Sequence, residues 1–329
     1  MFFPLLTTGV NYRVPARFFQ VGSQMIVGLL FLTLPLALSG CAILSSGSMF
    51  QTPDRPARAI VDTVPFFDQE KFQCGPAALA MALTWSGNPV QPADLTKEVF
   101  TTDLKGCLQS ALIGATRRNG RVAYVINGSE ALLDEVSAGN PVIVLVNIGL
   151  SWYPKWHYAV VIGFDRERDE IILHSGHIAN EHLSSRVFLN IWHRSDFWGL
   201  LVLPPERLPA GAGELEWLEA VAGLETTDRW QGSAAGYGAA LKRWPESFAA
   251  WMGLGNSRFN LHDLAGSAEA FRRAATLQPK SGIPLNNLAQ VLSAQGRHDE
   301  AVAAAQQAVD RGGPFIDDFR QTLKEIGSR

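Results

Sequence analysis

Residues 64–81, VPFFDQEKFQCGPAALAM, decide the fold of the middle of this chain. The stretch runs from an extended apolar segment through a polar loop to Cys74, where apolar residues with helical spacing begin. Pro76 suits the first turn of a helix, because its missing N–H has no intrahelical partner there. The leucines and alanines that follow predict one buried face, and Gly87 ends the helix. We therefore expect a helix that is headed by a cysteine.

Cys74 has the sequence surroundings that a catalytic thiol needs. A thiol at a helix N-terminus lies at the positive end of the helix dipole, which favours the thiolate. Gln69, five residues upstream, can bring a side-chain N–H to the same point. A base lies far downstream, where His157 begins the strand-like run 157–165, HYAVVIGFD. The pattern predicts Cys74 as nucleophile, His157 as base, and Gln69 with the Cys74 backbone N–H as oxyanion donors.

The segments 69–79 and 157–165 together resemble the C39-like cysteine peptidases, which are relatives of the leader-peptide-cleaving domains of bacteriocin exporters. The resemblance covers about residues 58–204. It implies an α+β papain-like domain that cleaves a peptide or a small exported protein and needs no cofactor. The transporter part of those exporters has no counterpart in this sequence.

Each motif has a second interpretation when it stands alone. A Cys-Gly-Pro is more often a buried structural cysteine, and a histidine at a strand start is usually structural. Their joint occurrence, with Gln69 upstream, favours catalysis. An amidase or a transglutaminase can use the same two groups, because nucleophile and base are shared across this broad group of folds.

The third catalytic member departs from the family pattern. In C39-like peptidases, an Asp or Asn on the strand after the histidine hairpin orients the imidazole. The corresponding place here is 173–176, LHSG, which has neither a carboxylate nor an amide. Ser175 or His174 can accept the hydrogen bond but supplies no negative charge. A non-catalytic scaffold or assembly factor at the cell envelope is therefore the competing interpretation.

Two further groups of side chains lie close to the predicted base in the sequence. Trp152, Tyr153 and Trp156 stand in a loop-like segment and are expected to contact substrate. His174 and His177 flank a Ser-Gly pair, but no cysteine or carboxylate pair completes a metal site with typical ligand spacing. We therefore expect no metal ion.

Residues 1–40 are typical of a secretory signal peptide. Basic residues precede the apolar run 25–38, which is too short and too interrupted by proline to span a membrane comfortably. The run leads into LSGC, residues 38–41, which resembles the lipobox of bacterial lipoproteins. The resemblance implies that Cys41 is the first mature residue and carries lipid, with residues 41–57 as a tether. An uncleaved anchor helix is the alternative.

The residue after the lipobox bears on localisation. Ala42 stands there in place of an Asp, the residue that would indicate retention at an inner membrane. We therefore expect a lipid-anchored protein of the cell envelope, on the outer membrane of a Gram-negative cell and facing the periplasm.

Composition limits the number of domains, the kinds of partner and the possible disulfides. The 329 residues, 47% hydrophobic and 18% charged, suffice for two or three globular domains. A net charge of -3 argues against nucleic acid as a partner. The cysteines are Cys41, Cys74 and Cys107. If the first carries lipid and the second is a free thiol, Cys107 has no disulfide partner, and its helical surroundings (residues 107–118) indicate a small buried residue.

The remaining pattern of the middle region predicts an α+β layout. Helices are expected at 92–100 and 107–118, and from a cap at Ser129 through 136. The continuous apolar run 141–148 predicts a central strand, and 157–165 with 170–175 predicts a hairpin. Residues 187–189 and 199–203 are expected to add strands.

The C-terminal part repeats every 34 residues. After a linker at 205–213, large apolar residues recur at Trp217, Trp251 and Leu285, with small, aromatic and proline positions in step. This period resembles tetratricopeptide repeats and predicts about three units over 214–329, with a capping helix at 315–326. The concave face of such a stack typically binds an extended peptide or a protein partner. A purely structural cap on the preceding domain is the alternative.

Overall fold

The computed structural model describes residues 49–50, 55–70, 72–103 and 105–328. The predicted signal peptide 1–40, the predicted lipidation site Cys41 and most of the predicted tether 41–57 lie outside these residues. Within the described ranges, no helix combines the length and the apolar character that a membrane crossing requires.

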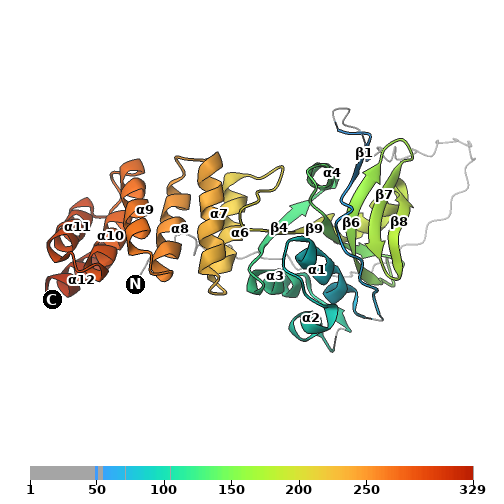
Figure 1. Ribbon diagram of the computed structural model, residues 1–329, viewed down its shortest axis with the longest axis horizontal. Coiled ribbons are helices and arrows are strands. Elements are labelled where there is room, and N and C mark those ends of the chain that lie inside the picture. The colour runs from blue at the N-terminus through green and yellow to red at the C-terminus, as the bar shows by residue number, and fades with distance from the viewer. Residues whose placement is uncertain (1–48, 51–54, 71, 104, 329) are drawn as a thin grey trace, which may run out of the picture. The chain divides into compact units, whose positions relative to one another are not determined.

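An antiparallel sheet of seven strands forms the centre of the first domain (Figure 1). Its order is β4-β9-β5-β6-β7-β8, and β1 pairs with β6. The strands are β1 (Arg58–Ile60), β4 (Val122–Asn127), β5 (Val142–Asn147), β6 (Trp156–Asp165), β7 (Glu170–Ser175), β8 (Ile178–Ser184) and β9 (Trp198–Leu203). The predicted central strand β5 pairs with both β6 and β9, and β6 and β7 form the predicted hairpin.

Helices cover both faces of this sheet. One buried cluster joins α1 (Cys74–Trp85), α2 (Pro92–Val99) and α3 (Gln109–Arg118) to side chains such as Val160. The other joins α4 (Ser129–Ser137) and α5 (Ser185–Trp192) to side chains such as Val161. The two valines are neighbours on β6, so their side chains point to opposite faces. The α+β class predicted from the sequence is confirmed.

Helix α1 is buried more completely than its sequence pattern predicts. Residues 75–83 are all buried, not only one face of the helix. The helix packs against the sheet and against α2 and α3, which leaves it no solvent-facing side over these turns. It ends as expected, because Gly87 has φ +84° and its N–H donates to the Thr84 carbonyl.

Residues 187–189 were predicted to form a strand, and this is wrong. They belong to helix α5, where the Ser184 hydroxyl caps the helix by accepting from the Val187 N–H. Phe188 and Trp192, one turn apart, are both fully buried. Tertiary packing of this pair decides the helix. The strand that precedes it, β8, is mostly exposed and was not predicted, because an exposed edge strand lacks the alternation that identifies a strand.

Two helix starts also differ from their predictions. Cys107 lies in the short strand β3 (Gly106–Cys107), which pairs with β2 (Phe100–Thr101), and the helix begins two residues later. Ser129 is the first helical residue of α4 and not its cap. The cap position belongs to Gly128, whose φ of 94° favours glycine.

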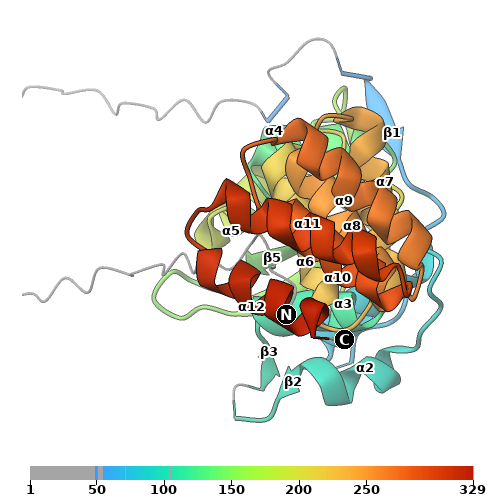
Figure 2. The ribbon, with the colours of Figure 1, turned by 90° about the vertical axis from the view of Figure 1, so that its left-hand side faces the viewer.

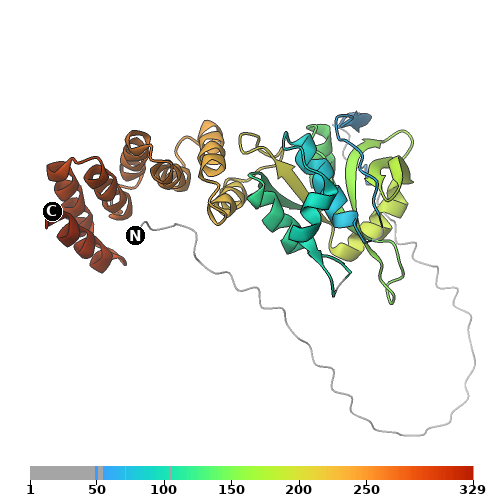
Figure 3. The ribbon, with the colours of Figure 1, turned by 60° about the horizontal axis from the view of Figure 1, so that its bottom comes forward.

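The C-terminal part consists of three helix pairs and a last helix, as the 34-residue period predicts. The helices are α6 (Glu214–Glu225), α7 (Trp230–Arg243), α8 (Phe248–Asn260), α9 (Leu264–Leu277), α10 (Ile283–Ala294), α11 (His298–Arg311) and α12 (Ile316–Gly327). Figures 2 and 3 show the pairs from two directions. A Cβ at Gly255 would lie 2.6 Å from the Phe271 ring, so the small residue lets α8 and α9 approach closely.

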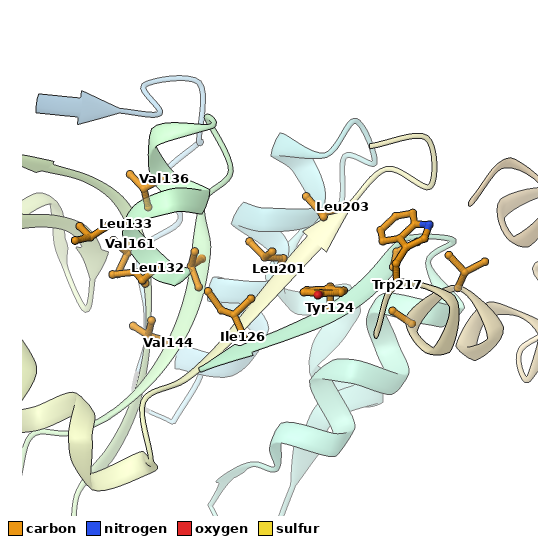
Figure 4. Packing of buried hydrophobic residues seen from close by; sticks show 14 of the residues in the cluster. Tyr124, Ile126, Leu132, Leu133, Val136, Val144, Val161, Leu201, Leu203 and Trp217 are labelled. Atoms are coloured by element: carbon orange, nitrogen blue, oxygen red, sulfur yellow. The ribbon is translucent and has the colours of Figure 1, made fainter. Parts of the chain in front are cut away.

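The first repeat helix packs directly against the sheet. Trp217 of α6 is fully buried, and its ring centroid lies 6.5 Å from that of Tyr124 on β4 (Figure 4). The Arg229 Nε donates to the Arg118 carbonyl at 2.7 Å. One continuous apolar cluster therefore includes strands of the sheet and helices α6 to α9. The 3₁₀ turn η1 (His193–Ser195) completes the described elements.

Candidate active site

Four of the predicted site residues come from two strands, one helix and one loop. Cys74 is the first residue of α1, His157 is the second residue of β6, and Ser175 is the last residue of β7. Gln69 lies in the loop before α1. Tyr158, which follows His157, is the point at which Cys74 and Gln69 both meet the sheet.

Gln69 is buried at 4% exposure and is held on both sides. Its Nε2 donates to the Tyr158 carbonyl at 3.4 Å, and its Oε1 accepts from the Gly176 N–H at 3.0 Å. The Gln69 backbone N–H also donates to the Gly176 carbonyl. An amide nitrogen carries two hydrogens, and the bond to Tyr158 uses one of them. The side chain can therefore keep its position and offer its second N–H to a bound group.

The Cys74 sulfur lies among backbone amides. The N–H groups of Cys74, Gly75 and Tyr158 bond to it, and each lowers the pKa of the thiol. Burial acts in the opposite direction and is the larger effect, so the pKa of Cys74 is raised overall. Burial therefore outweighs the preference for thiolate that the helix terminus alone predicts. The sequence does not reveal how deeply the thiol is buried.

The His157 imidazole contacts the predicted third member. Its Nε2 lies 3.1 Å from the Ser175 Oγ, and burial lowers its pKa. Since Nε2 is used in this way, Nδ1 is the nitrogen left for the thiol. No hydrogen bond between the Cys74 sulfur and the His157 ring occurs among the described residues. Both pKa shifts favour the uncharged forms, a thiol and a neutral imidazole.

Of the two alternatives for the third position, only Ser175 contacts the imidazole. His174 is buried at 4% exposure and is occupied elsewhere. Its Nε2 bonds to the Val64 carbonyl at 3.2 Å, and its Nδ1 accepts from the Asn180 N–H at 3.2 Å. The two neighbours on β7 point to opposite faces of the sheet, which separates their roles.

The aromatic residues before His157 are exposed. Trp152 is 80% exposed, Tyr153 62% and Trp156 50%. The loop that carries them is fixed at its base, where the Asn147 Oδ1 accepts from the N–H groups of Gly149 and Lys155, both at 2.9 Å. These rings therefore lie next to His157 in the chain without being part of the core.

Sequence reasoning did not identify the backbone contributions of Tyr158 and Gly176. They act through main-chain atoms, so residue type gives no signal for them. Their proximity to His157 and Ser175 in the chain is the one hint the sequence contains. Within the described residues, no group of three or more His, Cys, Asp or Glu side chains is arranged so that it could hold a metal ion. His177 pairs with Asp68 on the surface at 2.5 Å.

An antiparallel sheet, a helix headed by a cysteine and a histidine at a strand start define the α+β papain-like class of protein. Residues 61–196 match the model of the Peptidase_C39 like family, and residues 224–282 match a tetratricopeptide repeat model. Residues 61–196 thus form a domain that resembles the C39-like peptidase family, and tetratricopeptide repeats follow it. No protein of curated function matches the sequence.

Several solved structures are similar to parts of the chain. One is described as a C39-like peptidase from Bacillus anthracis, with 18% identity and a TM-score of 0.39, over 45% of this chain and 98% of that one. Another is the TPR2B domain in the pHsp70 complex of yeast Sti1, with 14% identity and a TM-score of 0.34, over 35% of this chain and 96% of that one. A third is the CopN–Scc3 complex, with 17% identity and a TM-score of 0.32, over 35% of this chain and 67% of the matched chain.

Proposed function

We propose that this chain is a cysteine peptidase that cleaves a peptide or a small exported protein with Cys74 as its nucleophile. The observation that carries the proposal is the convergence of Cys74 and Gln69 on Tyr158, the residue next to His157. The match of residues 61–196 to the C39-like family supports the same reaction class.

The proposed reaction begins with attack of the Cys74 sulfur on a peptide carbonyl carbon. The thiol proton passes to His157 Nδ1, and the imidazolium then gives a proton to the leaving amine. The Cys74 backbone N–H and the second N–H of Gln69 stabilise the oxyanion. Water hydrolyses the thioester, with His157 as base, which restores the thiol. Ser175 holds the imidazole through Nε2.

The exposed aromatic loop supports a role in substrate binding. Trp152, Tyr153 and Trp156 present large apolar surfaces to solvent directly before His157. Aromatic side chains offer such area with little loss of conformational freedom on binding. In this proposal they pack against apolar side chains of the substrate near the scissile bond.

We also propose a cellular location for the protein and a role for its repeats. Lipid on Cys41 anchors the protein at the cell envelope, on the outer membrane and facing the periplasm, as the lipobox resemblance implies. The tetratricopeptide repeats bind a protein partner or present the substrate, since such repeats serve protein–protein interaction.

A second candidate function is a non-catalytic scaffold that uses the peptidase fold as a binding surface. The uncharged forms favoured for Cys74 and His157, and the hydroxyl at Ser175 in place of a carboxylate, favour this alternative. A thiol that is not ionised is a weak nucleophile.

Two measurements on the full chain separate these functions. Comparing the exported proteins of cells with wild type and with Cys74→Ala should reveal a substrate that accumulates uncleaved only in the variant. An electrophilic thiol probe should label Cys74 faster than a thiol in an unfolded peptide, and His157→Ala should slow that labelling. The scaffold is favoured if Cys74 reacts no faster than the peptide thiol and no protein changes in length.

A further inference from the structure

A second free cysteine, Cys107, lies directly beside the start of α1. A Cβ built on Gly75 would lie 2.6 Å from the Cys107 Sγ and 2.8 Å from its Cβ. The thiol side chain of Cys107 therefore packs flat against the backbone of the residue that follows Cys74. Any side chain at Gly75 would displace it.

These contacts limit the distance between the two cysteines. With bonds of about 1.5 Å and neighbouring Cα atoms about 3.8 Å apart, the Cys107 sulfur lies within about 8 Å of the Cys74 Cα. A disulfide joins Cα atoms about 4.4–6.8 Å apart, so the link requires the Cys107 side chain to rotate and the short strand β3 to move toward the start of α1. Both cysteines pack against the same apolar cluster and are partly exposed, which leaves them open to a small oxidant.

Tyr158 connects the two cysteines. Its backbone N–H bonds to the Cys74 sulfur, and its hydroxyl donates to the Cys107 carbonyl at 3.2 Å. The charge of Cys74 also acts on its neighbour: burial first, and the Cys74 thiolate second, raise the pKa of Cys107 to about 12.

We propose that Cys107 is a resolving cysteine that captures oxidised Cys74 in a reversible disulfide. Hydrogen peroxide oxidises the Cys74 thiolate: the sulfur bonds to one oxygen, the O–O bond breaks, and sulfenic acid and hydroxide result. The Cys107 thiol then attacks the sulfenic sulfur, the Cys74–Cys107 bond forms, and water leaves. Each sulfur loses one electron in total, and peroxide takes both. A dithiol reductant reverses the link.

The order of events follows from the surroundings of each thiol. Burial raises the pKa of both thiols, but at Cys74 three backbone N–H groups oppose it, whereas at Cys107 no effect opposes it. Cys74 is therefore the thiol that meets the oxidant, and Cys107 is the thiol that resolves it. The Cys107 thiolate is scarce at neutral pH, so the link should form faster as pH rises.

The experiment treats the full chain and its Cys107→Ser variant with hydrogen peroxide and maps the thiols by peptide mass spectrometry. Wild type should give a peptide pair joined at Cys74 and Cys107 that has lost two hydrogens, and dithiothreitol should restore the Cys74 thiol nearly completely. The serine variant is almost isosteric, and melting curves establish that it folds. It should accumulate sulfinic and sulfonic acid at Cys74, with most of the thiol lost for good.

Three results would overturn the proposal. These are irreversible oxidation of Cys74 that is equal in wild type and Cys107→Ser, a link that contains Cys41 instead, and the absence of any joined peptide. The inference concerns the same thiol as the proposed peptidase, but disulfide formation requires no peptide cleavage. A chain that forms the link and cleaves nothing would refute the peptidase alone, and a peptidase without the link would refute this inference alone.

Discussion

Replacing Ser175 by Ala tests whether the imidazole is held for reaction with Cys74. The change removes the hydroxyl that lies 3.1 Å from His157 Nε2 and leaves the backbone of β7 intact. A hydrogen bond between uncharged groups contributes about 0.5–1.5 kcal/mol. Since about 1.4 kcal/mol corresponds to a factor of ten, the reactivity of Cys74 should fall about two- to tenfold.

The assay is the second-order rate at which iodoacetamide alkylates Cys74, followed on its peptide across a range of pH. The control is Ser185→Ala, which removes a hydroxyl bonded to Asp169 near the opposite end of β7. The Ser175 variant should be slower, and the Ser185 variant should match wild type. Equal rates in all three proteins, or equal losses in both variants, would show that Ser175 does not act through His157.

Ser175→Asp gives the opposite result if the reasoning holds. A carboxylate beside His157 opposes the effect of burial and raises the pKa of the imidazole, by about one unit or more. One unit corresponds to about tenfold more thiolate–imidazolium pair. Alkylation of Cys74 should therefore become faster and reach its plateau at lower pH. A pH profile identical to that of wild type would show that the third position has no electrostatic influence.

Two further changes test packing and charge, each by thermal unfolding. Gly75→Ala places a Cβ 2.6 Å from the Cys107 sulfur and should cost about 1–3 kcal/mol, whereas Gly238→Ala meets nothing within 4 Å and should gain about 0.5–1 kcal/mol in its helix. Equal effects of the two would contradict the contact. Glu225 accepts from the Tyr237 hydroxyl at 2.7 Å, and burial raises its pKa. Its ionisation therefore costs stability as pH rises through that raised pKa, so Glu225→Gln should stabilise the chain at neutral pH. The gain should vanish in acid, below the unfolded-state pKa; a gain that persists unchanged there would exclude this explanation.

Local sequence determined much of the architecture. Pro76 and Gly87 fix the two ends of the helix that Cys74 heads, because they act through their own backbone constraints. The run 141–148 is apolar on both faces, which only a central strand accommodates. The 34-residue period specifies the helix pairs of the C-terminal part, because each repeat carries the apolar and small residues of one pair.

Tertiary structure alone decided the chemistry of the site. Whether Ser175 or His174 faces His157 depends on the register of β6 and β7, which shifts between Val161 and Gly163. A slip of one residue exchanges the two faces of a strand, and no local pattern specifies such a slip. The net pKa shift of Cys74, in which burial opposes the backbone N–H groups, is likewise a property of the assembled fold. A helix terminus can be read from the sequence, but the burial that outweighs it comes from segments distant in the chain.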